Sequence, residues 1–117
     1  MNINITDSQI VSEVQSTLFS TIQQGPVNML VVLKNSGVNV ISYDFQEYNG
    51  TGWDDLGTQG SPLNNTLSPN QVVMLQVTSN YPQVQLLGNA SGGAFLEFAV
   101  TRYANRASGG PIPILNL

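Results

Sequence analysis

The sequence predicts an all-β protein, namely an immunoglobulin-like antiparallel β-sandwich of about seven strands with extended N- and C-terminal arms. Two observations carry this prediction. Apolar and polar residues alternate along several short segments, as they do in half-buried strands. Clusters of Gly, Pro, Asn and Ser separate these segments at intervals of about 8–12 residues. The chain has 117 residues, which is enough for one domain with its own core.

The individual strands follow from length, alternation and the turns between them. The expected strands are residues 12–22, 28–34, 38–48, 53–56, 71–78, 83–87 and 94–103. Segment 12–22 also has apolar residues spaced by four, which is typical of a helix, but its Ser and Thr content favours a strand. The Asn49-Gly50 pair predicts a hairpin, and residues 57–69 are expected to form a loop.

The two ends of the chain differ from the middle. We expect residues 1–10 to form an N-terminal arm, 11–104 the β-sandwich and 105–117 an extended C-terminal arm that contains two prolines. The apolar C-terminal tip has two possible places, either along its own sheet or against a neighbouring chain. Apolar residues of both arms are the candidate partner-binding residues: Ile3, Ile5, Ile112, Ile114, Leu115 and Leu117.

The charge content is unusually low. Charged residues make up 9% of the chain, compared with about 25% in typical proteins. Asn, Gln, Ser and Thr fill the polar positions, and such a surface loses less hydration energy on contact with another protein. Three basic residues and a net charge of −4 argue against nucleic-acid binding and against a polybasic membrane anchor.

The residue inventory also argues against catalysis. The chain has no Cys and no His, so thiol chemistry and the commonest general base are excluded. Asp54 and Asp55 are neighbours on a strand and point to opposite faces, and the same holds for Asp44 and Glu47. We therefore expect no catalytic residues, no cofactor and no metal, and the protein is not predicted to be an enzyme.

Two weaker alternatives involve the predicted hairpin. The oxygens of Asn49, Thr51, Asp54 and Asp55 lie close in sequence and could serve Ca²⁺, although their spacing is not that of an EF-hand and a simple turn is favoured. Trp53 could stack on a sugar, but packing on the sandwich core is the favoured interpretation.

A series of turn motifs resembles a known group of proteins. The motifs are Leu33-Lys34-Asn35-Ser36-Gly37, Ile41-Ser42-Tyr43, the run from Asn49 to Gly57, Leu67-Ser68-Pro69, the run from Tyr81 to Leu86, and Ser91-Gly92-Gly93. From about Ser16 to Tyr103 the chain resembles small β-sandwich proteins of tailed bacteriophages, including capsid decoration (cement) and head accessory proteins.

The resemblance implies a structural role in a virion, with no catalytic residues to carry over. It implies a protein that binds the outside of the major capsid shell and stabilises it, often as a homotrimer. The expected location is the capsid surface, after synthesis in the host cytoplasm. The alternatives are a carbohydrate-binding or adhesion module of a virion fibre, with Trp53 as the stacking residue, and a neck or tail accessory protein.

Overall fold

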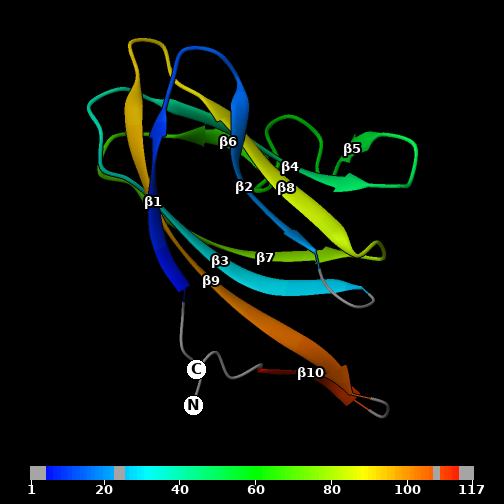
Figure 1. Ribbon diagram of the computed structural model, residues 1–117. Coiled ribbons are helices and arrows are strands. Elements are labelled where there is room, and N and C mark those ends of the chain that lie inside the picture. The colour runs from blue at the N-terminus through cyan, green and yellow to red at the C-terminus, as the bar shows by residue number, and fades with distance from the viewer. Residues whose placement is uncertain (1–4, 23–25, 107–108, 114–117) are drawn as a thin grey trace.

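The structure is a computed structural model that describes residues 5–22, 26–106 and 109–113, and Figure 1 shows its ribbon. The ten described strands are β1 (Ile5–Val11), β2 (Ser16–Ile22), β3 (Val27–Asn35), β4 (Ile41–Tyr48), β5 (Trp53–Asp55), β6 (Asn64–Leu67), β7 (Val72–Ser79), β8 (Gln83–Asn89), β9 (Ala94–Arg106) and β10 (Gly109–Pro113). The described residues form no helix, and thus none that could cross a membrane.

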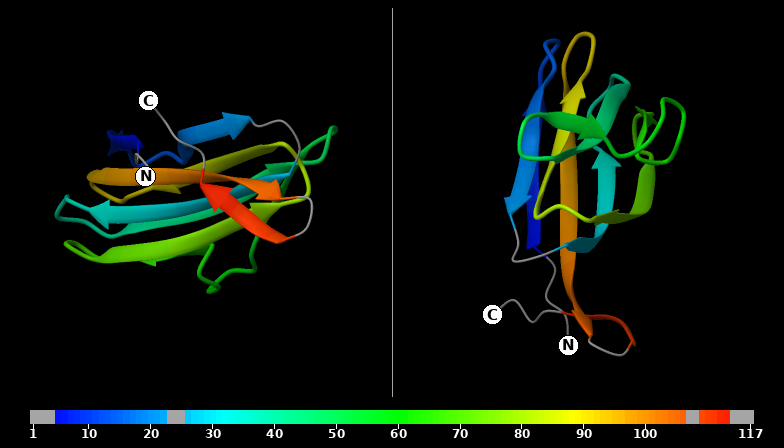
Figure 2. Two further views of the ribbon diagram at one scale, coloured as in Figure 1. Left: turned by 90° about the horizontal axis from the view of Figure 1, so that it is seen from below. Right: turned by 90° about the vertical axis from the view of Figure 1, so that its right-hand side faces the viewer.

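The strands form two antiparallel sheets that pack face to face as two layers (Figure 2). Sheet A has the order β1-β9-β3-β7, with β10 also pairing with the long β9. Sheet B has the order β2-β8-β4-β5, with β6 also pairing with β4. The prediction of an all-β antiparallel sandwich is confirmed.

The connectivity adds detail that strand spacing alone does not give. The chain crosses between the layers at most of its connections, although β4, β5 and β6 all lie in sheet B, and β1 pairs with the last long strand, β9. This is the connectivity of a jelly roll rather than of an immunoglobulin domain.

The structure has more strands than the pattern predicted. The seven expected strands correspond to β2–β5 and β7–β9, and β1, β6 and β10 are additional. Residues 5–10, expected in the N-terminal arm, belong to β1, which pairs with β9 from Ile5↔Val100 to Val11↔Ala94. Strand β6 lies inside the expected loop 57–69. Both segments are short or mainly polar edge strands, so they lack the apolar alternation on which the prediction depends.

The C-terminal segment returns along its own sheet. Strand β9 continues to Arg106, and β10 then pairs with it, with Ile112 opposite Ala104. Of the two places considered for residues 105–117, the described part therefore takes the one along its own sheet. Prolines 111 and 113 are compatible with this edge position, where a missing N–H costs no ladder bond inside the sheet.

The segment that was ambiguous between strand and helix is strand β2. A β-bulge between Thr17 and Phe19 breaks its ladder with β8, and Leu18 is buried. The Phe19 ring stacks on Phe98 of sheet A at 5.0 Å between centroids and meets Phe45 edge-on at 6.2 Å. The bulge thus lets two consecutive residues of β2 contact the core.

The core lies between the two layers and consists mainly of inward residues of β3, β4, β7, β8 and β9, together with Val11, Leu18, Leu67 and Ala90. Phe45, Met29 and Leu33 are its largest fully buried side chains. Burial of each such side chain contributes about 1.5–3 kcal/mol to folding. This core fixes which face of each strand points outward, and the outward faces carry the candidate sites.

Candidate functional site

The candidate partner-binding residues of the arms fall mostly outside the described part of the chain. Ile3, Ile114, Leu115 and Leu117 lie outside the described residues. Ile5 and Ile112 belong to β1 and β10, and the backbone of both strands pairs with β9. The structure therefore places these two positions at the margin of sheet A and leaves their role as partner-binding residues a prediction.

Trp53 lies on the hairpin of sheet B rather than in the core. It is the first residue of β5 and pairs with Tyr48 of β4. The two rings are 5.2 Å apart at 53°, and both side chains are half-buried. Trp53 is not part of the buried core cluster, so the favoured interpretation of core packing does not describe it. Part of its ring is covered by Tyr48.

The hairpin turn uses the oxygens that were considered for Ca²⁺. Asn49 Oδ1 accepts hydrogen bonds from Thr51 N, Thr51 Oγ1 and Gly52 N, each at 2.9 Å. Asn49 Nδ2 donates to Asp54 Oδ2 at 2.8 Å, and Gly50 supplies the positive φ of 100°. Within the described ranges no group of three or more acidic residues could hold a metal ion. The turn thus accounts for the side chains of Asn49, Thr51 and Asp54.

Two carboxyl groups meet on the outer face of sheet B. Asp44 projects from β4 and Asp55 from β5, and Gln46 Nε2 donates to Asp55 Oδ1 at 2.8 Å and to Asp44 Oδ2 at 3.3 Å. Burial, together with the hydrogen bond and charge of Asp55, raises the pKa of Asp44 from 3.8 to about 7. The hydrogen bonds from Asp44 and Gln46 lower the pKa of Asp55.

The raised pKa of Asp44 favours a proton shared by this pair at pH values below about 7. Asp44 Oδ1 is buried and has no hydrogen-bond partner among the described atoms. A proton on Asp44, donated to the Asp55 carboxylate, satisfies both groups, because two like charges in contact cannot both ionise at low cost. Carboxyl groups in hydrogen-bonding contact are closer than the ~5–9.5 Å that glycoside hydrolysis requires.

Sequence reasoning missed this pair because it compared only acids that are near each other along one strand. Asp44 and Asp55 are brought together by the β4–β5 hairpin, in which Gln46 lies opposite Asp55. The Asn49-Gly50 turn was the available signal, since a hairpin register built outward from it would have placed the two acids on one face.

Sheet A carries a different surface, which we call the apolar face. It consists of the outward side chains of β3, β7 and β9 together with one from β1: Leu30, Val32, Val72, Met74, Phe95, Ala99 and Ile10. Val32 pairs with Met74 and with Ala99, so these three side chains form a continuous row across three strands. Met74 is 68% exposed and Val72 57%.

Two charged residues of opposite sign lie beside the apolar face on β3 and β9. Lys34 and Glu97 are cross-strand partners, with Nζ and Oε2 at 4.0 Å, and Ser36 Oγ also donates to Glu97. An exposed pair of this kind contributes about 0–1 kcal/mol to stability. The apolar run 28–34 indicated a central strand, and β3 is central, but the pattern did not show that its outward residues Leu30 and Val32 remain only half-buried.

Comparison with known proteins identifies the fold and no family. No protein-family model and no curated protein matches the chain. Among solved structures, PirA is similar with a TM-score of 0.64 and 12% identity, over 86% of this chain and 96% of that one. The Yersinia pseudotuberculosis-derived mitogen is similar with a TM-score of 0.53 and 10% identity, over 97% and 100%. Identities this low indicate a shared fold alone.

Proposed function

We propose that this chain is a viral structural protein, a capsid decoration or cement protein that binds the outside of the major capsid shell and stabilises it. The observation that carries the proposal is the apolar face of sheet A. A sheet face that remains in water usually carries polar residues, whereas here a row of Val32, Met74 and Ala99 crosses three strands. Exposed apolar patches of this kind are typical of protein interaction sites.

The free energy expected from burial of the apolar face fits a protein that makes many contacts of moderate strength. Burial of a Val or Met side chain contributes about 1.5–3 kcal/mol, before the entropy cost of association is subtracted. Lys34 and Glu97 leave the face without net charge, so it would not repel a neutral protein surface. Many copies on one shell would add their individual contacts through multivalency.

The rest of the surface supports a binding protein rather than an enzyme. With 9% charged residues and many amides, the surface is inexpensive to desolvate. The proposed partners are the major capsid protein and further copies of the chain, with a trimer favoured, and the proposed location is the virion surface. Nucleic acid and membrane are not proposed as partners. A neck or tail accessory protein would differ from this proposal in its partner alone.

The test is co-sedimentation of purified protein with virus particles from the culture in which the protein is made. Met74→Lys introduces a charge at the most exposed residue of the apolar row and is expected to reduce particle occupancy at least tenfold. Thr78→Lys is the matched control, because it adds the same charge on the same exposed side of β7, away from the apolar row. Light scattering of both variants reports the oligomeric state.

Each outcome is informative. Loss of particle binding with Met74→Lys and retention with Thr78→Lys supports the assignment. Unchanged binding of both variants removes the apolar face as the docking surface. Failure of the parent protein to sediment with any capsid removes the decoration function. Loss of self-association by Met74→Lys without loss of capsid binding assigns the face to contacts between copies instead.

A further inference from the structure

A polar cavity of about 310 Å³ lies on the outer side of sheet B, on the opposite layer from the apolar face. Strands β4, β6 and β8 supply its floor, and the β1–β2 and β5–β6 connections supply its rim. Its lining residues are Gln15, Ser42, Tyr43, Asp44, Gln59, Gly60, Asn64, Asn65, Thr66 and Asn89. Its volume is at the lower end of the range for small-molecule sites.

The floor is built from two cross-strand rows. Ser42 of β4 lies between Asn89 of β8 and Thr66 of β6, and Asp44 pairs with Asn64 of β6. Neighbouring strands are about 4.8 Å apart, so a row of three polar side chains extends over about 10 Å. The sheet thus presents hydroxyl, amide and carboxyl groups at regular spacing on one rigid surface.

Some of the lining groups hold the walls in place. Asn64 Nδ2 donates to Gly57 O at 3.2 Å, and Asn65 Nδ2 donates to Gly60 O at 3.3 Å. The Tyr43 hydroxyl reaches through to the same loop and donates to Pro62 O at 2.6 Å. These bonds fix the β5–β6 connection against the sheet, so the cavity is preformed.

Other lining groups have no partner within the part of the chain that the structure describes. The side chains of Gln15, Ser42, Gln59 and Asn89 make no hydrogen bond to any described residue. They come from two loops and two strands, and their donors and acceptors converge on one cavity. A ligand that replaces their water must offer several donors and acceptors of its own, because buried polar groups without partners cost about 1–3 kcal/mol each.

The chemistry of the walls selects a class of ligand. Among the described residues no lysine or arginine lines the cavity, and the carboxyl group that does is that of Asp44, so an anion would find no counter-charge. An apolar ligand would desolvate the amides without compensation. We propose that this cavity binds a neutral carbohydrate, whose adjacent hydroxyl groups both donate and accept hydrogen bonds. This proposal does not rest on the decoration function.

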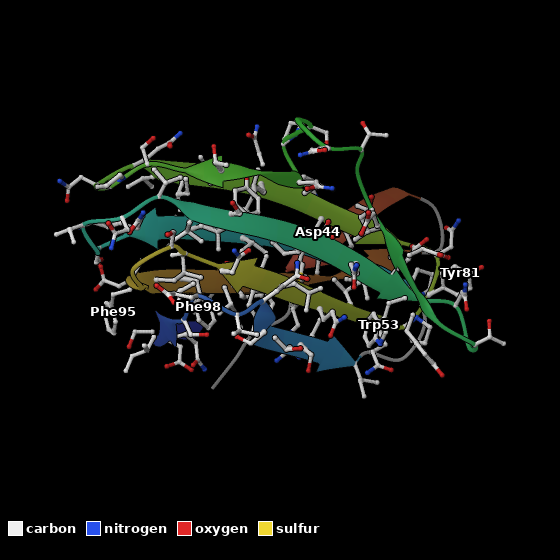
Figure 3. All side chains as sticks on the ribbon, turned by 90° about the horizontal axis from the view of Figure 1, so that it is seen from above. Asp44, Trp53, Tyr81, Phe95 and Phe98 are labelled. Atoms are coloured by element: carbon white, nitrogen blue, oxygen red, sulfur yellow. The ribbon has the colours of Figure 1, made fainter. Side chains whose placement is uncertain are left out.

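The proposed site differs from the sugar-stacking role considered for Trp53. Figure 3 shows Asp44 on the outer side of the sheet, well separated from Trp53 at the hairpin end. Trp53 is not among the lining residues, and the aromatic residue that is, Tyr43, is buried in the core. Without a stacking platform, affinity for a single sugar is expected in the millimolar range, as for a site that depends on hydrogen bonds alone.

The test is an NMR titration of isotope-labelled full-length protein with neutral monosaccharides: glucose, galactose, mannose and N-acetylglucosamine. Sorbitol tests an acyclic polyol, and glucuronic acid tests an anionic sugar. We expect at least one neutral sugar to shift the backbone amide signals of Ser42, Asn65 and Asn89. Sorbitol and glucuronic acid are expected to cause smaller shifts of the same signals. Shifts confined to Trp53 and Tyr48, or no shifts with any neutral sugar, overturn the proposal, as does preference for glucuronic acid.

Substitutions separate this site from non-specific sugar contact. Asn89→Ala and Ser42→Ala are each expected to weaken binding about tenfold, because each removes hydrogen bonds to the sugar and leaves the core intact. Gln83→Ala is the matched control, since Gln83 is an amide on the same strand and the same face as Asn89 but outside the cavity. Equal effects of Asn89→Ala and Gln83→Ala would overturn the assignment.

Discussion

Substitution of Asn35 by Ala is expected to destabilise the fold strongly, although the residue is polar and stands at the end of a strand. Asn35 is fully buried. Its Nδ2 donates to Asn39 O at 2.8 Å and to Leu67 O at 2.9 Å, and its Oδ1 accepts from Gly37 N at 2.9 Å. One side chain thus closes the β3–β4 turn and ties it to β6, which pairs on the other layer.

The magnitude follows from the bonds that are lost. Each hydrogen bond contributes about 0.5–1.5 kcal/mol net, and acceptors left buried cost more than the bond itself. Three bonds give a loss of about 3 kcal/mol for Asn35→Ala, out of about 5–15 kcal/mol for a whole domain. For a chain of this size the loss corresponds to a fall in Tm of about 10–15 °C.

The assay is urea unfolding followed by far-ultraviolet circular dichroism, with calorimetry for the Tm. Asn80→Ala is the control, because Asn80 is exposed and makes no side-chain hydrogen bond to the described residues; its effect is expected within ~0.5 kcal/mol. A loss below about 1 kcal/mol for Asn35→Ala would refute the reasoning, since it would mean that the three bonds contribute no more than water does.

Two further predictions concern sheet B. Because folding raises the pKa of Asp44 from 3.8 to about 7, the folded protein holds this proton more tightly than the unfolded chain does, so stability falls as pH rises from about 4 to about 7 and is level above that. We expect a loss of about 1–2 kcal/mol in urea unfolding between about pH 4 and 7, after allowance for solvent screening, and Asp44→Asn, which keeps a donor for Asp55, should flatten this dependence. An equally steep dependence in Asp44→Asn would contradict the shared proton. Gly88→Ala should cost about 1–3 kcal/mol in the same assay, because its Cβ would lie 2.6 Å from Leu18 Cδ1 in the core; a neutral effect would show that Leu18 moves freely.

Local chemistry determined the strands that the sequence could predict. In β4 and β9 apolar and polar residues alternate, so each strand has one apolar face whichever element packs on it. The bounds of both strands can therefore be predicted from a few consecutive residues. The Asn49 side chain closes its turn through bonds to residues two and three positions away, and the Asn-Gly signal therefore worked. The choice of strand over helix for β2 succeeded for the same local reason, the Ser and Thr content.

Strand membership at the edges depended on partners far away in sequence. Strand β1 is mainly polar, and its ladder to β9 joins residues that are more than 80 positions apart. Strand β6 has four residues and pairs with β4 inside a segment rich in turn residues. Backbone hydrogen bonds stabilise such strands with little contribution from the side-chain pattern. Their sequences therefore show no periodicity from which the strands could be predicted.

The sequence by itself determined the fold class, the main strands and a surface poor in charge, since these depend on composition and on neighbours along the chain. Only the tertiary structure decided which side chains lie together on one surface. Packing of the two layers left Met74 and Val72 exposed, and the hairpin and sheet registers brought Asp44 to Asp55 and Ser42 to Asn89. Register is set by the whole core, because a shift of one residue would exchange the inward and outward faces of a strand.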